Sequence, residues 1–160
     1  DVGVTRALSE LLKVVRESLK MEVLFVGEIT QGRRVFRHVS SSIDPLPLRV
    51  GDSNRAADTV CQRVLDGRLP AVIPSIRKIY PEHGLAPEDH EPVLAHIGVP
   101  VYLPHGRLYG VLCGFNMLKH DTFTTRDLKR MRVAAAAAAR ILAQADGHEV
   151  QIGAPRGPVR

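Results

Sequence analysis

The sequence predicts an α+β domain in which an antiparallel sheet of five or six strands is covered on one face by an N-terminal and a C-terminal helix. The chain opens and closes with segments of helical periodicity, and short apolar segments bounded by turn residues lie between them. Two of these segment pairs are joined by tight turns, which makes their strands antiparallel neighbours. At 160 residues and 44% hydrophobic content, the chain fits one domain with a real core.

The first third of the chain predicts a helix followed by a strand hairpin. Residues 4–20 are expected to be an amphipathic helix, because their apolar side chains recur at helical spacing on one face. Residues 21–29 are apolar on both faces at their centre, which is typical of an interior strand. A turn at 30–33 then leads into a second strand at 35–39, where polar residues alternate more often.

The middle of the chain predicts a short helix and a long loop. Asn54 is expected to cap a helix that Gly67 ends, and a short strand follows at 71–74. Residues 75–95 have no sustained period and contain three prolines, so they are expected to form a loop with one or two helical turns.

The last third predicts a second hairpin and a long helix. Strands at 96–104 and 107–117 are expected to turn at His105 and Gly106. Thr124 and Asp127 have the spacing of a capping box at the start of the final helix. An a/d seam on this helix predicts packing against the first helix and against a second copy of the chain; its residues are Leu128, Met131, Ala135, Ala138 and Leu142.

Composition excludes several classes of protein. No apolar run approaches the ~20 residues of a membrane span, and two cysteines without a C-x-x-C pair suit the reducing cytoplasm rather than a disulfide framework. The formal charge is +5, but the basic residues are scattered and aromatic residues are only 4%, so nucleic-acid binding is not expected. The domain is expected to span 1–150, with a disordered tail or linker at 151–160.

Three segments resemble a known family. CQRVLDGRLPAVIP at 61–74, IGVPVYLPHGRLYGVLCGF at 97–115 and FTTRDLKRM at 123–131 look like a GAF domain. The resemblance implies a regulatory module of a larger signalling protein, such as a cyclic di-GMP enzyme or a sensor kinase. It also implies a small molecule held between the sheet and its covering loop, with an attached output domain.

Specialised members of that family fit less well. Loop 75–95 has no cysteine, which argues against bilin attachment and against the methionine sulfoxide reductases of this fold. The cyclic-nucleotide signature is matched only in part, by Asn116, Lys119, Phe123 and Asp127. The cofactor is therefore left unnamed.

The candidate ligand-binding residues lie in or beside the loop that would cover a GAF ligand. They are Cys61, Ser75, Arg77, Tyr80, His83, His90 and His96. Cys61 shares a helical face with apolar residues and has no histidine within one turn, so it is expected to be a core residue at the pocket wall rather than a nucleophile. Cys113 is expected to be core on its strand.

No catalytic constellation and no metal-binding spacing is found in the sequence. The function expected is therefore a non-enzymatic sensor that passes its ligand state through the terminal helices to the output domain. Two alternatives stay open. One is a dimerisation or scaffold module with a vestigial pocket, and the other is a haem-based redox or gas sensor that uses one of the loop histidines.

Overall fold

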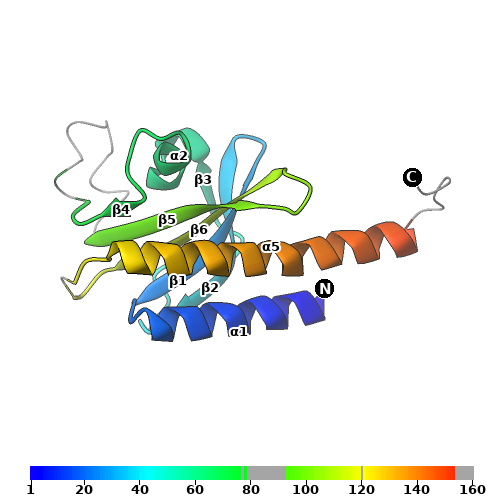
Figure 1. The fold of residues 1–160 in the computed structure, drawn as a ribbon, viewed down its shortest axis with the longest axis horizontal. Coiled ribbons are helices and arrows are strands. Elements are labelled where there is room, and N and C mark those ends of the chain that lie inside the picture. The colour runs from blue at the N-terminus through cyan, green and yellow to red at the C-terminus, as the bar shows by residue number, and fades with distance from the viewer. Residues whose placement is uncertain (77, 79–92, 120, 154–160) are drawn as a thin grey trace.

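The computed structural model describes residues 1–76, 78, 93–119 and 121–153. Within these residues the chain forms one six-stranded antiparallel sheet with strand order β3-β2-β1-β6-β5-β4 (Figure 1). The α+β prediction is confirmed. The strands are β1 (Val23–Thr30), β2 (Arg33–Ser41), β3 (Ser53–Arg55), β4 (Val72–Ile73), β5 (Ala95–Tyr102) and β6 (Leu108–Asn116).

Two long helices cover one face of the sheet. α1 (Val2–Ser18) and α5 (Thr125–Gly153) lie side by side and run in opposite directions, so that α1 begins at the end of the molecule where α5 finishes (Figure 1). The short 3₁₀ helix η1 (Ala56–Asp58) and α2 (Val60–Leu65) lie over the opposite face. No helix among the described residues is both long and apolar enough to cross a membrane.

The face beneath α1 and α5 is a densely filled apolar layer. Leu8 and Leu12 of α1 and Met131 and Ala138 of α5 are all completely buried. They pack in one cluster with strand residues such as Leu24. The small side chains of α5 let this helix approach the sheet closely, and its amino end is fixed by the predicted capping box. In that box Thr124 N–H donates to Asp127 Oδ2 at 2.8 Å, and Asp127 N–H donates to Thr124 Oγ1 at 3.2 Å.

β1 is an interior strand, as its apolar character on both faces predicts. It pairs with β2 on one side and with β6 on the other. Val23 and Phe25 join the cluster on the α2 side, whereas Leu24 and Val26 join the cluster beneath α1 and α5. Alternation along one strand therefore supplies both faces of the domain.

The glycine pair in β6 allows close packing within the domain. A Cβ at Gly110 would lie 1.9 Å from the carbonyl oxygen of Gly27, and one at Gly114 would lie 2.5 Å from Sδ of Met21. Both positions are filled by the protein itself, so the glycines serve neighbouring backbone and side-chain packing rather than a ligand.

The buried carboxylate of Glu22 links the start of β1 to the end of β6 by hydrogen bonds. Glu22 Oε1 accepts hydrogen bonds from the backbone N–H groups of Met117 and Leu118 at 2.6 and 2.9 Å. The Glu22 N–H donates to Asn116 Oδ1 at 3.0 Å. These bonds satisfy the backbone where β6 leaves the sheet.

Two predictions are corrected by the structure. Asn54 does not cap a helix, because it lies in edge strand β3; Thr59 caps α2 instead, accepting from the Gln62 N–H at 3.1 Å. The a/d seam of α5 is not a free surface for a partner. Met131, Ala135, Ala138 and Leu142 are buried against the sheet and α1, and Leu128 packs at the margin of the same cluster. The predicted contact between α1 and α5 is confirmed.

Candidate functional site

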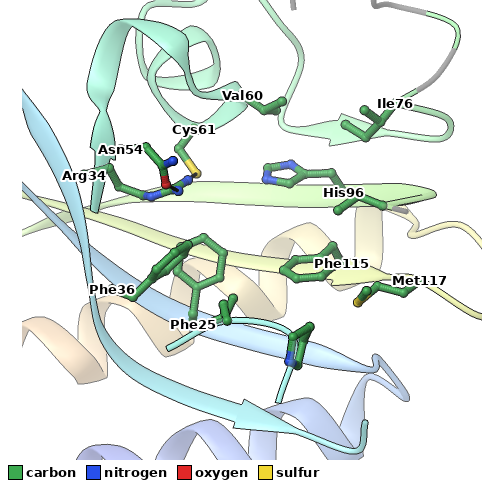
Figure 2. Close-up of a pocket in the computed structure, with 13 residues that line it drawn as sticks. Phe25, Arg34, Phe36, Asn54, Val60, Cys61, Ile76, His96, Phe115 and Met117 are labelled. Atoms are coloured by element: carbon green, nitrogen blue, oxygen red, sulfur yellow. Dashed lines mark hydrogen bonds between the residues drawn. The ribbon is translucent and has the colours of Figure 1, made fainter. Parts of the chain in front are cut away.

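A cavity of about 250 Å³ lies on the face of the sheet opposite α1 and α5. Its wall is formed by β1, β2, β3, α2, β5, β6 and the adjoining loops (Figure 2). The lining residues are Phe25, Arg34, Phe36, Pro47, Leu48, Asn54, Val60, Cys61, Ile76, Val93, His96, Phe115 and Met117.

Three phenylalanines form the apolar part of this cavity. Phe25, Phe36 and Phe115 come from β1, β2 and β6, where strand alternation directs them to the same face. The rings of Phe25 and Phe36 meet edge to face, with centroids 4.9 Å apart, and Phe115 lies 6.3 Å from Phe25. Figure 2 shows these rings across the cavity from His96 and Cys61.

Arg34 brings a positive charge into this aromatic surface. Its guanidinium lies 4.2 Å from the ring centroid of Phe36 and 5.6 Å from that of Phe25. Nη2 donates to Asn54 Oδ1, and Nη1 donates to Cys61 Sγ at 3.4 Å. Nε is buried and has no hydrogen-bond partner within the described part of the chain. Gly27 makes room for the arginine, because a Cβ there would lie 3.1 Å from Arg34 Cδ.

Cys61 lies in the first turn of α2, and its side chain is 2% exposed. Its Sγ is 3.3 Å from the Sγ of Cys113 on β6, and both thiols are free. The hydrogen bond from Cys113 holds the pKa of Cys61 well below its usual range, and the charges of Arg34 and His96 act in the same direction. Burial and the neighbouring Cys61 raise the pKa of Cys113.

His96 completes a buried cluster with the two cysteines. It lies on β5, next to β6 in the sheet, and is 5% exposed. Its Nδ1 is buried and finds no hydrogen-bond partner among the described residues. One potential ligand atom from each of Cys61, His96 and Cys113 lies within 4.8 Å of the others.

The structure brings together only part of the predicted site. Cys61 and His96 both line the cavity, and Cys61 is buried at its wall as expected. Ser75 is half-buried beside the lining residue Ile76 but is not itself part of the lining. The other four candidates, Arg77, Tyr80, His83 and His90, lie outside the described residues.

Arg34, Asn54 and Cys113 are site residues that the sequence analysis did not select. Arg34 precedes Phe36 by two positions on β2, and this spacing places both on one face of a strand. That spacing was the available signal for the arginine. Nothing local in the sequence indicates that Cys113 meets Cys61.

Three of the four residues that match the cyclic-nucleotide signature have structural roles instead. Asn116 is buried, accepts from the Glu22 N–H and donates to the carbonyl oxygen of Asp121 at 3.0 Å. Phe123 belongs to the core beneath α5, and Asp127 caps that helix. None of these three residues lines the cavity.

A family model described as the GAF domain matches residues 2–143. The chain therefore belongs to the GAF domain family, and it is a sensory or regulatory domain of that family.

Solved structures agree with this assignment at the level of the fold. The GAF domain of a phosphoenolpyruvate-protein phosphotransferase from Acinetobacter superposes with a TM-score of 0.70 at 18% identity, over 96% of this chain and 87% of that one. The blue-light-absorbing PixJ GAF domain from Thermosynechococcus elongatus gives 0.69 at 15% identity, over 94% and 90%. The GAF-B domain of DevS from Mycobacterium smegmatis gives 0.69 at 12% identity, over 92% and 98%. No curated protein sequence matches the chain significantly.

Proposed function

We propose that this GAF domain senses a small molecule bearing an anionic or hydrogen-bond-accepting group, which binds in the cavity beside Arg34 and His96. The observation that carries the proposal is the pair of buried polar atoms, Arg34 Nε and His96 Nδ1, for which the described residues offer no partner. An unsatisfied buried donor or acceptor costs about 1–3 kcal/mol. A bound ligand that pairs with these atoms would recover part of that cost.

The size and lining of the cavity support a compact ligand with an apolar body. Its volume of about 250 Å³ is slightly below the range of roughly 300–1,000 Å³ typical of drug-sized ligands. The rings of Phe25, Phe36 and Phe115 provide a surface for the apolar part, and Arg34 suits a carboxylate or a similar acceptor. This volume favours a small metabolite over a haem or a bilin.

The path from cavity to output would run through β5. His96 lines the cavity, whereas its neighbour Ile97 belongs to the cluster beneath α1 and α5. α5 packs against β5 more extensively than against any other strand. A ligand that favours one position of His96 would therefore shift the population of β5 and α5 arrangements.

The domain is proposed to act without catalysis, in the cytoplasm, within a signalling protein of the cyclic di-GMP or sensor-kinase type. The proposal includes a homodimer whose interface is formed by α1 and α5. Because the a/d seam is buried within the chain, a dimer would use outward-facing residues such as Val14 and Val133, which are 66% and 70% exposed.

A thermal-shift screen tests the proposal directly. The purified chain would be heated with amino acids, aliphatic and aromatic carboxylates, and nucleotides, including cyclic di-GMP. A ligand present at about 100 times its Kd stabilises the fold by about 2.7 kcal/mol, which raises the Tm of a domain of this size by roughly 5–10 °C. Arg34→Met should abolish the shift produced by a carboxylate, whereas Arg49→Met, at an exposed arginine, should preserve it.

The scaffold alternative gives a different result. A vestigial pocket predicts that no compound shifts the Tm, that native mass spectrometry shows no retained small molecule, and that Arg34→Met leaves dimerisation unchanged. That combination would refute the sensing proposal.

A further inference from the structure

We propose that Cys61, His96 and Cys113 form a binding site for a thiophilic metal ion, best suited to Zn²⁺, with the fourth coordination position open to the cavity. The spacing of cysteines and histidines along the chain matches no zinc signature and predicts no metal site. The fold supplies the site by bringing α2, β5 and β6 together.

The separation of the two sulfurs is close to the one that zinc requires. In a tetrahedral site with Zn–S bonds of about 2.3 Å, two sulfurs lie about 3.8 Å apart. The sulfurs of Cys61 and Cys113 are 3.3 Å apart, so a small movement of either side chain would admit the ion. The ligand atom of His96 lies within 4.8 Å of both, and sulfur with imidazole nitrogen is a donor set that favours zinc over magnesium or calcium.

Burial argues that these three residues are more than incidental neighbours. Cys61, His96 and Cys113 are 2%, 5% and 1% exposed. Nδ1 of His96 has no hydrogen-bond partner among the described residues. Coordination of a metal ion by one of the two ring nitrogens would explain why this polar side chain is buried here. Binding Zn²⁺ would release the two thiol protons and leave a neutral unit of one ion and two thiolates.

The β5 backbone leaves space at the centre of the cluster. Gly98 pairs with Cys113 across the two strands. A Cβ at this position would lie 3.1 Å from Cys113 Sγ and 3.1 Å from Cε1 of His96. A side chain there would press on two of the three proposed ligands, so glycine keeps both free to adjust.

Arg34 determines what could occupy the fourth position. Its Nη1 donates to Cys61 Sγ, which is a bond that a metal-bound thiolate can keep. The guanidinium adds a positive charge next to a neutral metal unit, and so it favours an anionic fourth ligand such as hydroxide or a carboxylate. His96 and Cys61 line the cavity, which places this open position where a small molecule could enter.

His96 Nδ1 would pair with either the ion or the proposed organic ligand, so the two proposals share this atom. They can still fail separately, because each is measured in the absence of the other. Zinc and cobalt binding are measured with no organic compound present. The thermal-shift screen is repeated on metal-free and on zinc-loaded protein, so that a chain that binds metal but no metabolite is recognised as such.

The first test uses the reduced, metal-free, full 160-residue chain titrated with Co²⁺, a spectroscopic substitute for zinc. The expected result is one Co²⁺ bound per chain. The intensity of the thiolate-to-cobalt charge-transfer absorption should correspond to two thiolate ligands, and the visible bands should be those of a tetrahedral ion. Zn²⁺ should displace the cobalt and raise the Tm. This measurement needs no variant, so it remains informative even if a cysteine substitution unfolds the domain.

The second test assigns the ligands. Cys61→Ser, Cys113→Ser and His96→Gln should each lower the zinc affinity by more than about 100-fold, since each removes one of the three ligands that the described residues supply. His105→Gln is the matched control, because His105 lies in the exposed turn between β5 and β6, and it should bind zinc as the parent does. Circular dichroism checks that each variant is folded.

Three results would overturn the proposal. One is a folded, reduced chain that shows no cobalt–thiolate absorption. Another is metal binding that survives all three substitutions in folded variants. The third is a Cys61–Cys113 disulfide that persists under excess reductant, because it would leave no thiolate to bind the ion.

Discussion

The two faces of the sheet are built from the same strands but are filled differently. Beneath α1 and α5 the described residues form a large cluster of apolar side chains, and many of its members are completely buried. On the opposite face the same strands present aromatic rings, an arginine and a histidine, and α2 adds the Cys61 thiol, around a cavity of about 250 Å³; the Cys113 thiol lies behind Cys61 in the same cluster. The contrast indicates that the helix-covered face stabilises the domain and that the cavity face is available for binding.

This division follows from strand alternation. Adjacent residues of one strand, such as His96 and Ile97, point to opposite faces of the sheet. The side chains of one face can therefore be substituted while those of the other face stay the same. Substitutions on the helix-covered face are therefore expected to change stability most, and substitutions on the cavity face are expected to change binding most.

The largest effect is expected on the helix-covered face. Met131→Ala should lower the free energy of unfolding by about 2–5 kcal/mol, because the side chain is completely buried and the surrounding residues can close the void only in part. Arg132→Ala, at an exposed position of the same helix, should change it by less than about 0.5 kcal/mol. Urea denaturation followed by circular dichroism measures both, and equal losses would contradict the contrast between the two faces.

The next effect concerns the junction that both faces share. Glu22→Ala should cost about 1–3 kcal/mol, because it removes the acceptor of the Met117 and Leu118 N–H groups. Glu28→Ala removes only a partly exposed ion pair with Arg37, and should cost less than about 1 kcal/mol. If chemical denaturation gave the two variants the same midpoint, the proposed role of the Glu22 carboxylate would be wrong.

A smaller effect on stability is expected on the cavity face. Arg34→Met loses the contacts of the guanidinium with two rings and its hydrogen bonds to Cys61 and to the exposed Asn54. It also removes a buried Nε that has no partner among the described residues. These contributions are similar and opposite, so the free energy of unfolding should change by less than about 1 kcal/mol. A loss as large as that of Met131→Ala, measured under the same conditions, would show that Arg34 is primarily a structural residue.

The smallest effect is a pH dependence from His38 on β2. Burial lowers the pKa of His38 below 6.5, with smaller contributions from the charges of Arg37 and the amino terminus. The unfolded chain therefore binds a proton more readily, so this contribution is fully present above pH 6.5 and is lost as the pH falls through the lower folded pKa. Thermal melts between pH 7.5 and 5 should show a shallower decline for His38→Gln than for the parent or for His105→Gln.

Most of the fold follows from local patterns in the sequence. Three local patterns each predict an element that the structure contains. They are the apolar stripe of α1, the apolar residues on both faces of β1, and the capping box at the start of α5. The segment around Asn54 was predicted wrongly because Ala56, Ala57, Val60 and Cys61 also fit helical spacing. Pairing with β2 draws Ser53–Arg55 into the sheet, and this tertiary interaction outweighs a weak local preference.

The site is harder to predict, since it depends on which elements meet in space. Cys61 and Cys113 are 52 positions apart, and each looks like an ordinary core residue in its own segment. Periodicity tells which face of a helix or strand a residue occupies but not which residue lies opposite. The a/d seam of α5 shows the same limit, because its pattern predicts an apolar contact and the fold supplies that contact from within the chain.

The shortness of α2 has a consequence for detecting an occupant of the cavity. A helix of six residues is far below the roughly 12–15 that an isolated helix needs in water, so α2 persists only through its contacts with the rest of the domain. A metal or ligand that joins Cys61 to β5 and β6 would add a link across this boundary. Amide hydrogens of α2 should then exchange with solvent more slowly, and they should respond to the occupant before the amides of the strands do.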